Sequence, residues 1–153
     1  MAETNFTIKG DVEIYYEGKV FRHHNSLSNS AKEVIAHCLA GDDDYKLNGI
    51  IMLYSLDDDP QGMTRTSMSY ITQRSYQNNN TELKLSALFN LEYGPNSTSA
   101  TIKFLDLGAR QKDVYTPGTP QRIIFSTCDL SSENPPLTTT AKQLSINWII
   151  KPQ

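Results

Sequence analysis

The sequence is poor in the residues that mark several common classes of protein. It has only two cysteines, one tryptophan and three histidines in 153 residues. A chain of this length buries roughly 70% of the surface that it exposes when unfolded. We therefore expect one domain over residues 1–153 whose core needs neither disulfide nor metal. The N-terminus has no basic segment followed by an apolar run, so we expect no secretory signal and two free, buried thiols.

An excess of positive charge and long apolar runs are also missing. Lysine and arginine number 14 against 17 aspartates and glutamates, which gives a formal net charge of −3. A nucleic-acid-binding module normally carries a basic face, and a membrane span needs ~20 mostly apolar residues. We therefore expect no nucleic-acid partner and no membrane.

Several short segments alternate between apolar and polar residues, which predicts half-buried strands. The clearest segment is 81–93, with the odd-numbered positions from Leu83 to Tyr93 facing inward. Gly10 interrupts the first segment and indicates a bulge or a close approach of the backbone. The expected strands are 6–16, 19–23, 47–56, 65–73, 81–93, 100–107, 121–130 and 143–151.

The turns between these segments suggest how they pair. The turn residues 94–97 predict a hairpin of 81–93 with 100–107, and the apolar phase shifts between Phe104 and Leu105, as at a bulge. Segments 108–120 and 131–140 are expected to be loops. About seven or eight strands predict a mostly β protein, namely an antiparallel sandwich of jelly-roll or immunoglobulin-like type, or a related barrel.

One segment, 30–39, has a helical period instead. Ser30 and Glu33 fit a capping box, and Gly41 is placed to end the helix in a left-handed conformation. A helix of three turns is too short to be stable alone, so we expect it to pack on a sheet. The residues of its apolar stripe are Ala31, Val34, Ile35, Cys38 and Leu39.

Residues able to carry chemistry are scattered. His23 and His24 are adjacent in an expected strand, so they point to opposite faces and do not easily share a metal. Cys38 lies on the apolar stripe and diverges from His37, which favours a core cysteine over a nucleophile. We expect no catalytic, cofactor-binding or metal site, no cofactor and no enzyme activity.

Two acidic triplets, Asp42–Asp44 and Asp57–Asp59, leave one question open. Oxygen-rich loops bind calcium, but neither triplet has the spacing of an EF-hand loop. If the two loops converge they could bind calcium jointly; otherwise they are solvated loops or complement a basic partner.

A resemblance to a known family runs through most of the chain. Residues 25–41, which read NSLSNSAKEVIAHCLAG, resemble the segment with which virion proteins of tailed bacteriophages introduce a short helix ending in Leu-Ala-Gly. Residues 101–109 are similar to the segment that usually reads I-x-E-x-G-L-F in this group, although the Glu-Gly pair is absent. Residues 144–150, LSINWII, resemble its closing strand, commonly L-x-I-x-W-x-I.

The resemblance implies a structural component of the virion, synthesised in the host cytoplasm. Such a protein forms or joins an oligomeric ring or collar at the neck or tail, or anchors a fibre. It implies a homo-oligomer with portal, neck, tail or fibre proteins as partners, and loops 108–120 and 131–140 as candidate subunit contacts. The alternative is a carbohydrate- or receptor-binding β-sandwich module that uses exposed tyrosines, with or without calcium held by the aspartate loops.

Overall fold

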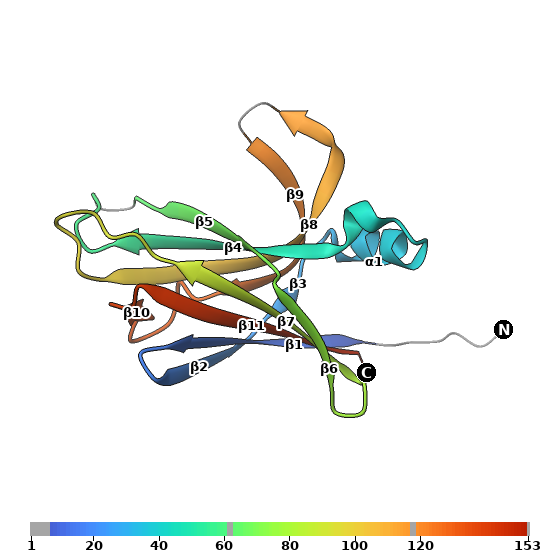
Figure 1. Cartoon of the computed structure of the whole chain (residues 1–153), viewed down its shortest axis with the longest axis horizontal. Helices are drawn as coiled ribbons and strands as arrows, with labels where there is room; N and C mark the ends of the chain where they lie inside the picture. The colour runs from blue at the N-terminus through green and yellow to red at the C-terminus, as the bar shows by residue number, and fades with distance from the viewer. Residues whose placement is uncertain (1–6, 61–62, 117–118, 153) are drawn as a thin grey trace.

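The computed structural model describes residues 7–60, 63–116 and 119–152, and between 110 and 122 it describes the backbone alone. These residues form two antiparallel sheets and one α-helix (Figure 1). The first sheet has the order β2-β1-β11-β7-β6 and the second the order β3-β9-β8-β4-β5, with β10 paired to β8. The expected mostly β sandwich with one early helix is therefore confirmed.

The elements have the following bounds. The first sheet contains β1 (Ile8–Tyr16), β2 (Lys19–His24), β6 (Gln73–Gln77), β7 (Glu82–Asn90) and β11 (Gln143–Pro152). The second contains β3 (Ser26–Leu27), β4 (Leu47–Leu56), β5 (Arg65–Tyr70), β8 (Ala100–Thr116), β9 (Thr119–Asp129) and β10 (Thr138–Thr139). Helix α1 spans Ala31–Leu39, and a 3₁₀ turn, η1, spans Asp43–Tyr45.

Both edges of the sandwich are closed by chain that continues from one sheet into the other. Strand β2 is an edge of the first sheet and β3, one residue later, is an edge of the second. Strands β5 and β6 are related in the same way across Ile71 and Thr72. The expected strand 65–73 is thus two strands bent around a corner, which partly explains why the structure has more strands than the sequence predicted.

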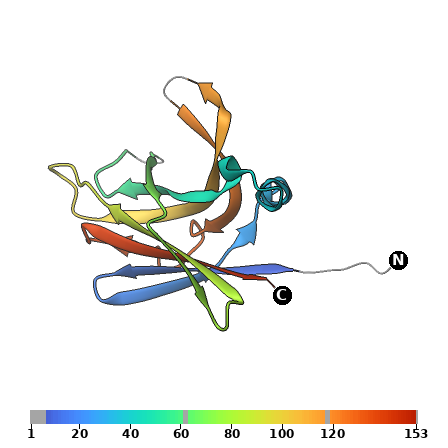
Figure 2. The same cartoon turned by 45° about the vertical axis from the view of Figure 1, so that its right-hand side comes forward.

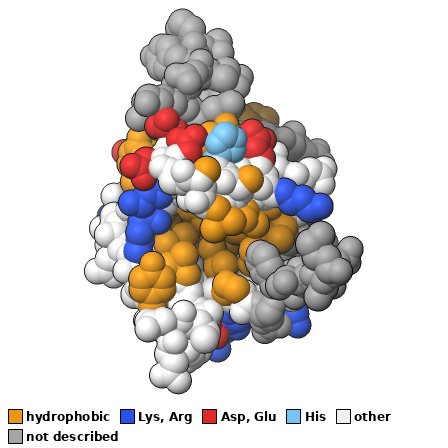
Figure 3. Space-filling view, turned by 90° about the vertical axis from the view of Figure 1, so that its right-hand side faces the viewer, with side chains coloured by type: hydrophobic (Ala, Val, Ile, Leu, Met, Phe, Trp, Pro, Cys, Tyr) orange, Lys and Arg blue, Asp and Glu red, His pale blue; other side chains and the backbone are white. Residues whose placement is uncertain are grey.

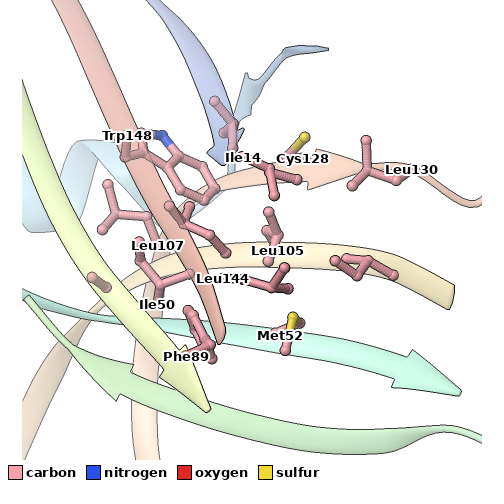
Figure 4. Close-up of a cluster of buried hydrophobic side chains, with 14 of the residues drawn as sticks. Ile14, Ile50, Met52, Phe89, Leu105, Leu107, Cys128, Leu130, Leu144 and Trp148 are labelled. Atoms are coloured by element: carbon pink, nitrogen blue, oxygen red, sulfur yellow. The ribbon is translucent and has the colours of Figure 1, made fainter. Parts of the chain in front are cut away.

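The core lies between the inner faces of the two sheets (Figure 4). The inward residues predicted for 81–93 and 143–151 are confirmed as buried or partly buried, but Asn147 and Ile149 on the opposite face of 143–151 are buried as well. Trp148 is fully buried in this core, where Figure 4 labels it together with Ile14 and Cys128. The phase shift near Phe104 is also confirmed, because Leu53 pairs with Phe104 and Tyr54 with Ile102, which leaves Lys103 as the extra residue.

Two expectations about connections are wrong. Segments 81–93 and 100–107 do not form a hairpin, because β7 pairs with β6 and β11 while β8 pairs with β4 and β9. Residues 94–97 do form a turn, in which Ser97 N–H donates to the carbonyl of Gly94, but the turn leads into the other sheet. Segment 108–120 is not a loop either where the structure describes it, since β8 continues to Thr116 and β9 begins at Thr119, and residues 117–118 lie outside the described residues. Gly108 and Pro120 lie within these two strands.

Candidate functional site

Helix α1 is only half covered by the sheet. Ala31 and Val34 are buried, whereas Leu39 is 84% exposed and Cys38 is exposed as well. The expectation that Cys38 belongs to the core is therefore wrong; both thiols are free, and only that of Cys128 is buried. The left-handed stop is confirmed by φ +83° at Gly41, but the Ser30 side chain makes no capping hydrogen bond.

An apolar groove opens beside this uncovered face of α1. It has a volume of about 600 Å³ and lies between α1, the start of β1 and β3. Figure 3 shows hydrophobic side chains filling the centre of this end of the molecule, with lysine or arginine side chains on both sides. The groove is lined by Thr7, Ile8, Leu27, Lys32, Ile35, Ala36 and Leu39.

Four carboxylates lie on α1 and η1, one in the first turn of the helix and three at the start of η1. We call Glu33 and Asp42–Asp44 the acidic corner. The ring of His37 stacks on that of Tyr45, with centroids 3.7 Å apart, and its Nδ1 lies 3.1 Å from Oδ2 of Asp42. Oδ1 of Asp42 accepts from the backbone N–H of Asp44 at 3.1 Å. In Figure 3 acidic side chains and a histidine lie directly above the apolar area.

A two-stranded arm projects from the second sheet. Strand β4 pairs with β8 only as far as Ala109, whereas β8 and β9 pair further out as well, at Arg110 with Arg122 and, after a shift of register, at Tyr115 with Pro120 and Thr116 with Thr119. Among the described residues no third strand pairs with this ribbon, which stands clear of the sandwich in Figures 1 and 2. We call residues 110–122 the arm. An isolated two-stranded ribbon is marginally stable in water at best.

The structure brings His23, Cys128 and Glu133 together, which no sequence motif indicated. The Nδ1 atom of His23 lies 3.6 Å from Sγ of Cys128, and its Nε2 lies 2.9 Å from Oε1 of Glu133. The order of groups resembles that of a thiol nucleophile with its base.

The chemistry of this cluster is nevertheless that of a structural contact. Cys128 is 0% exposed, and burial, together with the nearby carboxylates of Asp129, Glu133 and Asp106, raises the pKa of its thiol to about 12. The thiol is therefore neutral at pH 7, and its sulfur has no path to a substrate. The cluster connects β2 to the end of β9 and the following loop. His24, as expected, points the other way, and its Nδ1 lies 2.5 Å from Oδ1 of Asp11.

The two acidic triplets do not converge. They precede and follow β4, a strand of ten residues, which separates them by roughly 30 Å. The possibility of a joint calcium site is therefore wrong. Among the described residues no group of three or more histidine, cysteine, aspartate or glutamate side chains is arranged to hold a metal ion.

The second triplet instead fastens loops of its own chain. Asp57 accepts from the backbone and hydroxyl of Thr98, and these hydrogen bonds lower the pKa of its carboxyl group. Asp59 accepts from Arg65, which lowers its pKa too. Asp58 accepts from the hydroxyl of Ser97.

The fold and these surfaces define a β-sandwich with a half-covered helix and a projecting arm. No protein-family model, curated protein or solved structure matches the chain. In the part of the chain that the structure describes, no helix has the length and apolar character needed to cross a bilayer.

Proposed function

We propose that this protein is a structural subunit of a tailed-phage virion, which works as a homo-oligomer in a ring or collar at the neck or tail or at the base of a fibre. The arm is the observation that carries the proposal. Beyond Ala109 its two strands have only each other as pairing partners in the described chain. Such a ribbon gains little stability alone, so packing against a second subunit would supply the stabilising contacts that it lacks within its own chain.

The uncovered face of α1 supports the same proposal. Leu27 and Leu39, 43% and 84% exposed, border the apolar groove. Contiguous exposed apolar surface on a folded domain is typical of a protein interface. Contacts between different patches of identical subunits form closed rings when the rotation closes.

The resemblance on which the phage context depends lies in framework segments. Residues 25–41 form β3, α1 and the Gly41 stop, and the closing motif places Trp148 in the core. Motifs of this kind specify the fold of one subunit. The arm and the groove lie outside the core of that fold and offer surfaces through which subunits can assemble.

Two observations on the full-length chain test the proposal. Negative-stain electron microscopy of the purified protein should show rings or short stacks of rings. Mass spectrometry of purified virions from phage-producing cultures of the source should detect the chain in the particle. A dispersed monomer that is also missing from such particles would overturn the proposal.

A second candidate function is carbohydrate binding on the outer face of the first sheet. Tyr15 and Val20 are paired across β1 and β2, and Leu88 lies two strands away from Tyr15 through Ser145. The three apolar side chains are 37%, 48% and 45% exposed, next to a shallow groove that Gln143 also lines. An exposed tyrosine beside an amide is suited to stacking on a sugar ring.

Glycan-array binding distinguishes this candidate from assembly. Binding that is abolished by Tyr15→Ala but preserved in Tyr76→Ala, where a tyrosine is lost from β6 instead, would favour it. Such binding should survive EDTA, because the oxygens of Asp57 and Asp59 already accept hydrogen bonds from the protein.

A further inference from the structure

We infer that the apolar groove and the acidic corner together receive the arm of a second copy of this chain. The inference rests on the proposed homo-oligomer and names the two surfaces that meet in it. The contact is heterologous, since the arm of one subunit meets a different patch of the next.

Charge complementarity is the first argument for this occupant. Residues 110–122 contain three arginines or lysines and one aspartate in the sequence, which gives a formal charge of 3 − 1 = +2. The acidic corner contributes four carboxylates, those of Glu33 and Asp42–Asp44, within one short stretch of the chain. Opposite potentials on two surfaces steer them together and fix their register.

Shape is the second argument. Strand β8 ends at Thr116, opposite Thr119, and Thr119 lies only four residues before Ile123, the partner of Ala109, so the arm is roughly 13 Å long at ~3.3 Å per residue. Helix α1 has nine residues and is roughly 14 Å long at ~1.5 Å per residue. The arm is thus about as long as the helix that borders the groove, so it can lie along α1.

Direction is the third argument. In Figure 1 the arm rises from the second sheet, whereas the end with α1 and the start of β1 faces to the right. Figure 3 views that end directly and shows the apolar area at its centre. In the described part of the chain the arm of a subunit therefore does not lie over its own groove, as a contact with the arm of another copy requires.

The apolar part of the contact has a direct test with a matched control. Leu39→Asp places a charge in the groove, and Leu88→Asp places the same charge on an exposed leucine of the first sheet. We expect Leu39→Asp to weaken self-association at least tenfold and Leu88→Asp to leave it unchanged, as measured by sedimentation equilibrium. Equal masses for wild type and Leu39→Asp would contradict the inference.

Complementary charge reversals test the pairing itself. The first variant carries Arg110→Glu, Lys112→Glu and Arg122→Glu in the arm. The second carries Glu33→Lys, Asp43→Lys and Asp44→Lys in the corner, which gives it a formal charge of 3 − 1 = +2, and leaves Asp42, which hydrogen bonds within η1, intact. Circular dichroism melts of both variants establish that each is folded.

Each variant alone should sediment as a monomer, because its own arm and corner now repel. An equimolar mixture should regain the wild-type mass, because each arm then meets a corner of opposite charge. A mixture that stays monomeric, or variants that assemble alone as well as the wild type does, would overturn the inference. If the variants assemble normally, the protein is still a homo-oligomer, but its subunits meet at another surface. If the wild type is itself a monomer, both the proposed function and the inference are wrong.

Discussion

Ala109 of β8 pairs with Leu47 of β4, and this is the last pair that those two strands make. Up to that point β8 lies inside a sheet, with β4 on one side and β9 on the other. Beyond it, β9 alone remains beside β8. The pair therefore marks the boundary between the sandwich and an arm whose two strands have only each other as pairing partners in the described chain.

The contact between Gly10 and Asn25 predicts the effect of a single methyl group. A Cβ on Gly10 would lie less than 3.0 Å from the amide of Asn25, at the corner where β2 passes into β3. The Asn25 amide is the end of a side chain and can shift, so Gly10→Ala should lower the free energy of unfolding by about 1 kcal/mol, the lower end of the usual cost of overpacking. Gly94→Ala is the control, since nothing lies within 4 Å of a Cβ there. Equal denaturant midpoints for the two variants would show that the corner is not tightly packed.

Trp148 predicts a difference between two substitutions at one position. Its side chain is fully buried, and its Nε1 has no hydrogen-bond partner within the described structure. Trp148→Ala should cost about 3–5 kcal/mol of stability, because it opens a large cavity between the sheets. Trp148→Phe should cost clearly less, because it keeps a ring and removes a buried donor. Urea unfolding followed by far-ultraviolet circular dichroism measures both, and equal costs would contradict this description of the core.

The two thiols should differ in reactivity. Cys38 is exposed, although burial of its sulfur and the charge of Asp42 raise its pKa, whereas Cys128 is buried and its pKa is raised to about 12. Native protein should thus react with one equivalent of Ellman's reagent, and unfolded protein with two. Cys38→Ser should abolish the native reaction. Rapid labelling of a second thiol in native protein would indicate that the cluster of Cys128, His23 and Glu133 is open to solvent.

Asp106 predicts a stability change that depends on pH. Burial raises the pKa of its carboxyl group, despite a 2.8 Å hydrogen bond from the hydroxyl of Thr127. The folded state holds this proton more tightly than the unfolded state, so stability falls as pH rises from about 4 through the folded pKa. Asp106→Asn should therefore stabilise the protein at pH 7, and the gain should vanish at pH values below about 4.

Asp57 supplies the matched control for that experiment, with the opposite sign. Hydrogen bonds from Thr98 lower its folded pKa, so its contribution is present above the unfolded pKa and is lost as pH falls through the folded value. Asp57→Asn should destabilise the protein at pH 7 and have little effect in acid. Thermal melts between pH 3 and pH 7 measure both variants, and curves with the same slope would refute this account of the two carboxylates.

The local periodicity of the sequence predicted the strands and the helix well, but it predicted poorly which strands pair with each other. The alternation of Leu85, Ala87 and Phe89 is a property of one strand, so it indicated which side chains face the core. The turn at 94–97 has the residue types of any chain reversal. Its local sequence does not indicate that the following strand belongs to the second sheet. The length of the arm was missed for a related reason, since Gly108 looked like a loop residue but is buried between β4 and β9.

The candidate surfaces depend on tertiary structure to a greater degree. Helical spacing places Val34 and Cys38 on one stripe, but it does not say how far the sheet extends beneath the helix, so the exposure of Cys38 was not predictable. His23 and Cys128 lie 105 residues apart in sequence and meet only because β3 brings the end of β2 beside β9. No motif carries that information.

The mass of the full-length chain in solution is the most direct test of assembly through the arm. Light scattering during size-exclusion chromatography should give a multiple of the 17.2 kDa chain mass, consistent with a closed ring. A variant with residues 110–122 replaced by Asn-Gly, a tight hairpin turn, should melt within a few degrees of the wild type and elute as a monomer, whose mass is below 17.2 kDa because the variant has 13 − 2 = 11 residues fewer. A full-length protein that elutes as a monomer at every concentration tested, or an arm-shortened variant that keeps the oligomeric mass, would contradict the account.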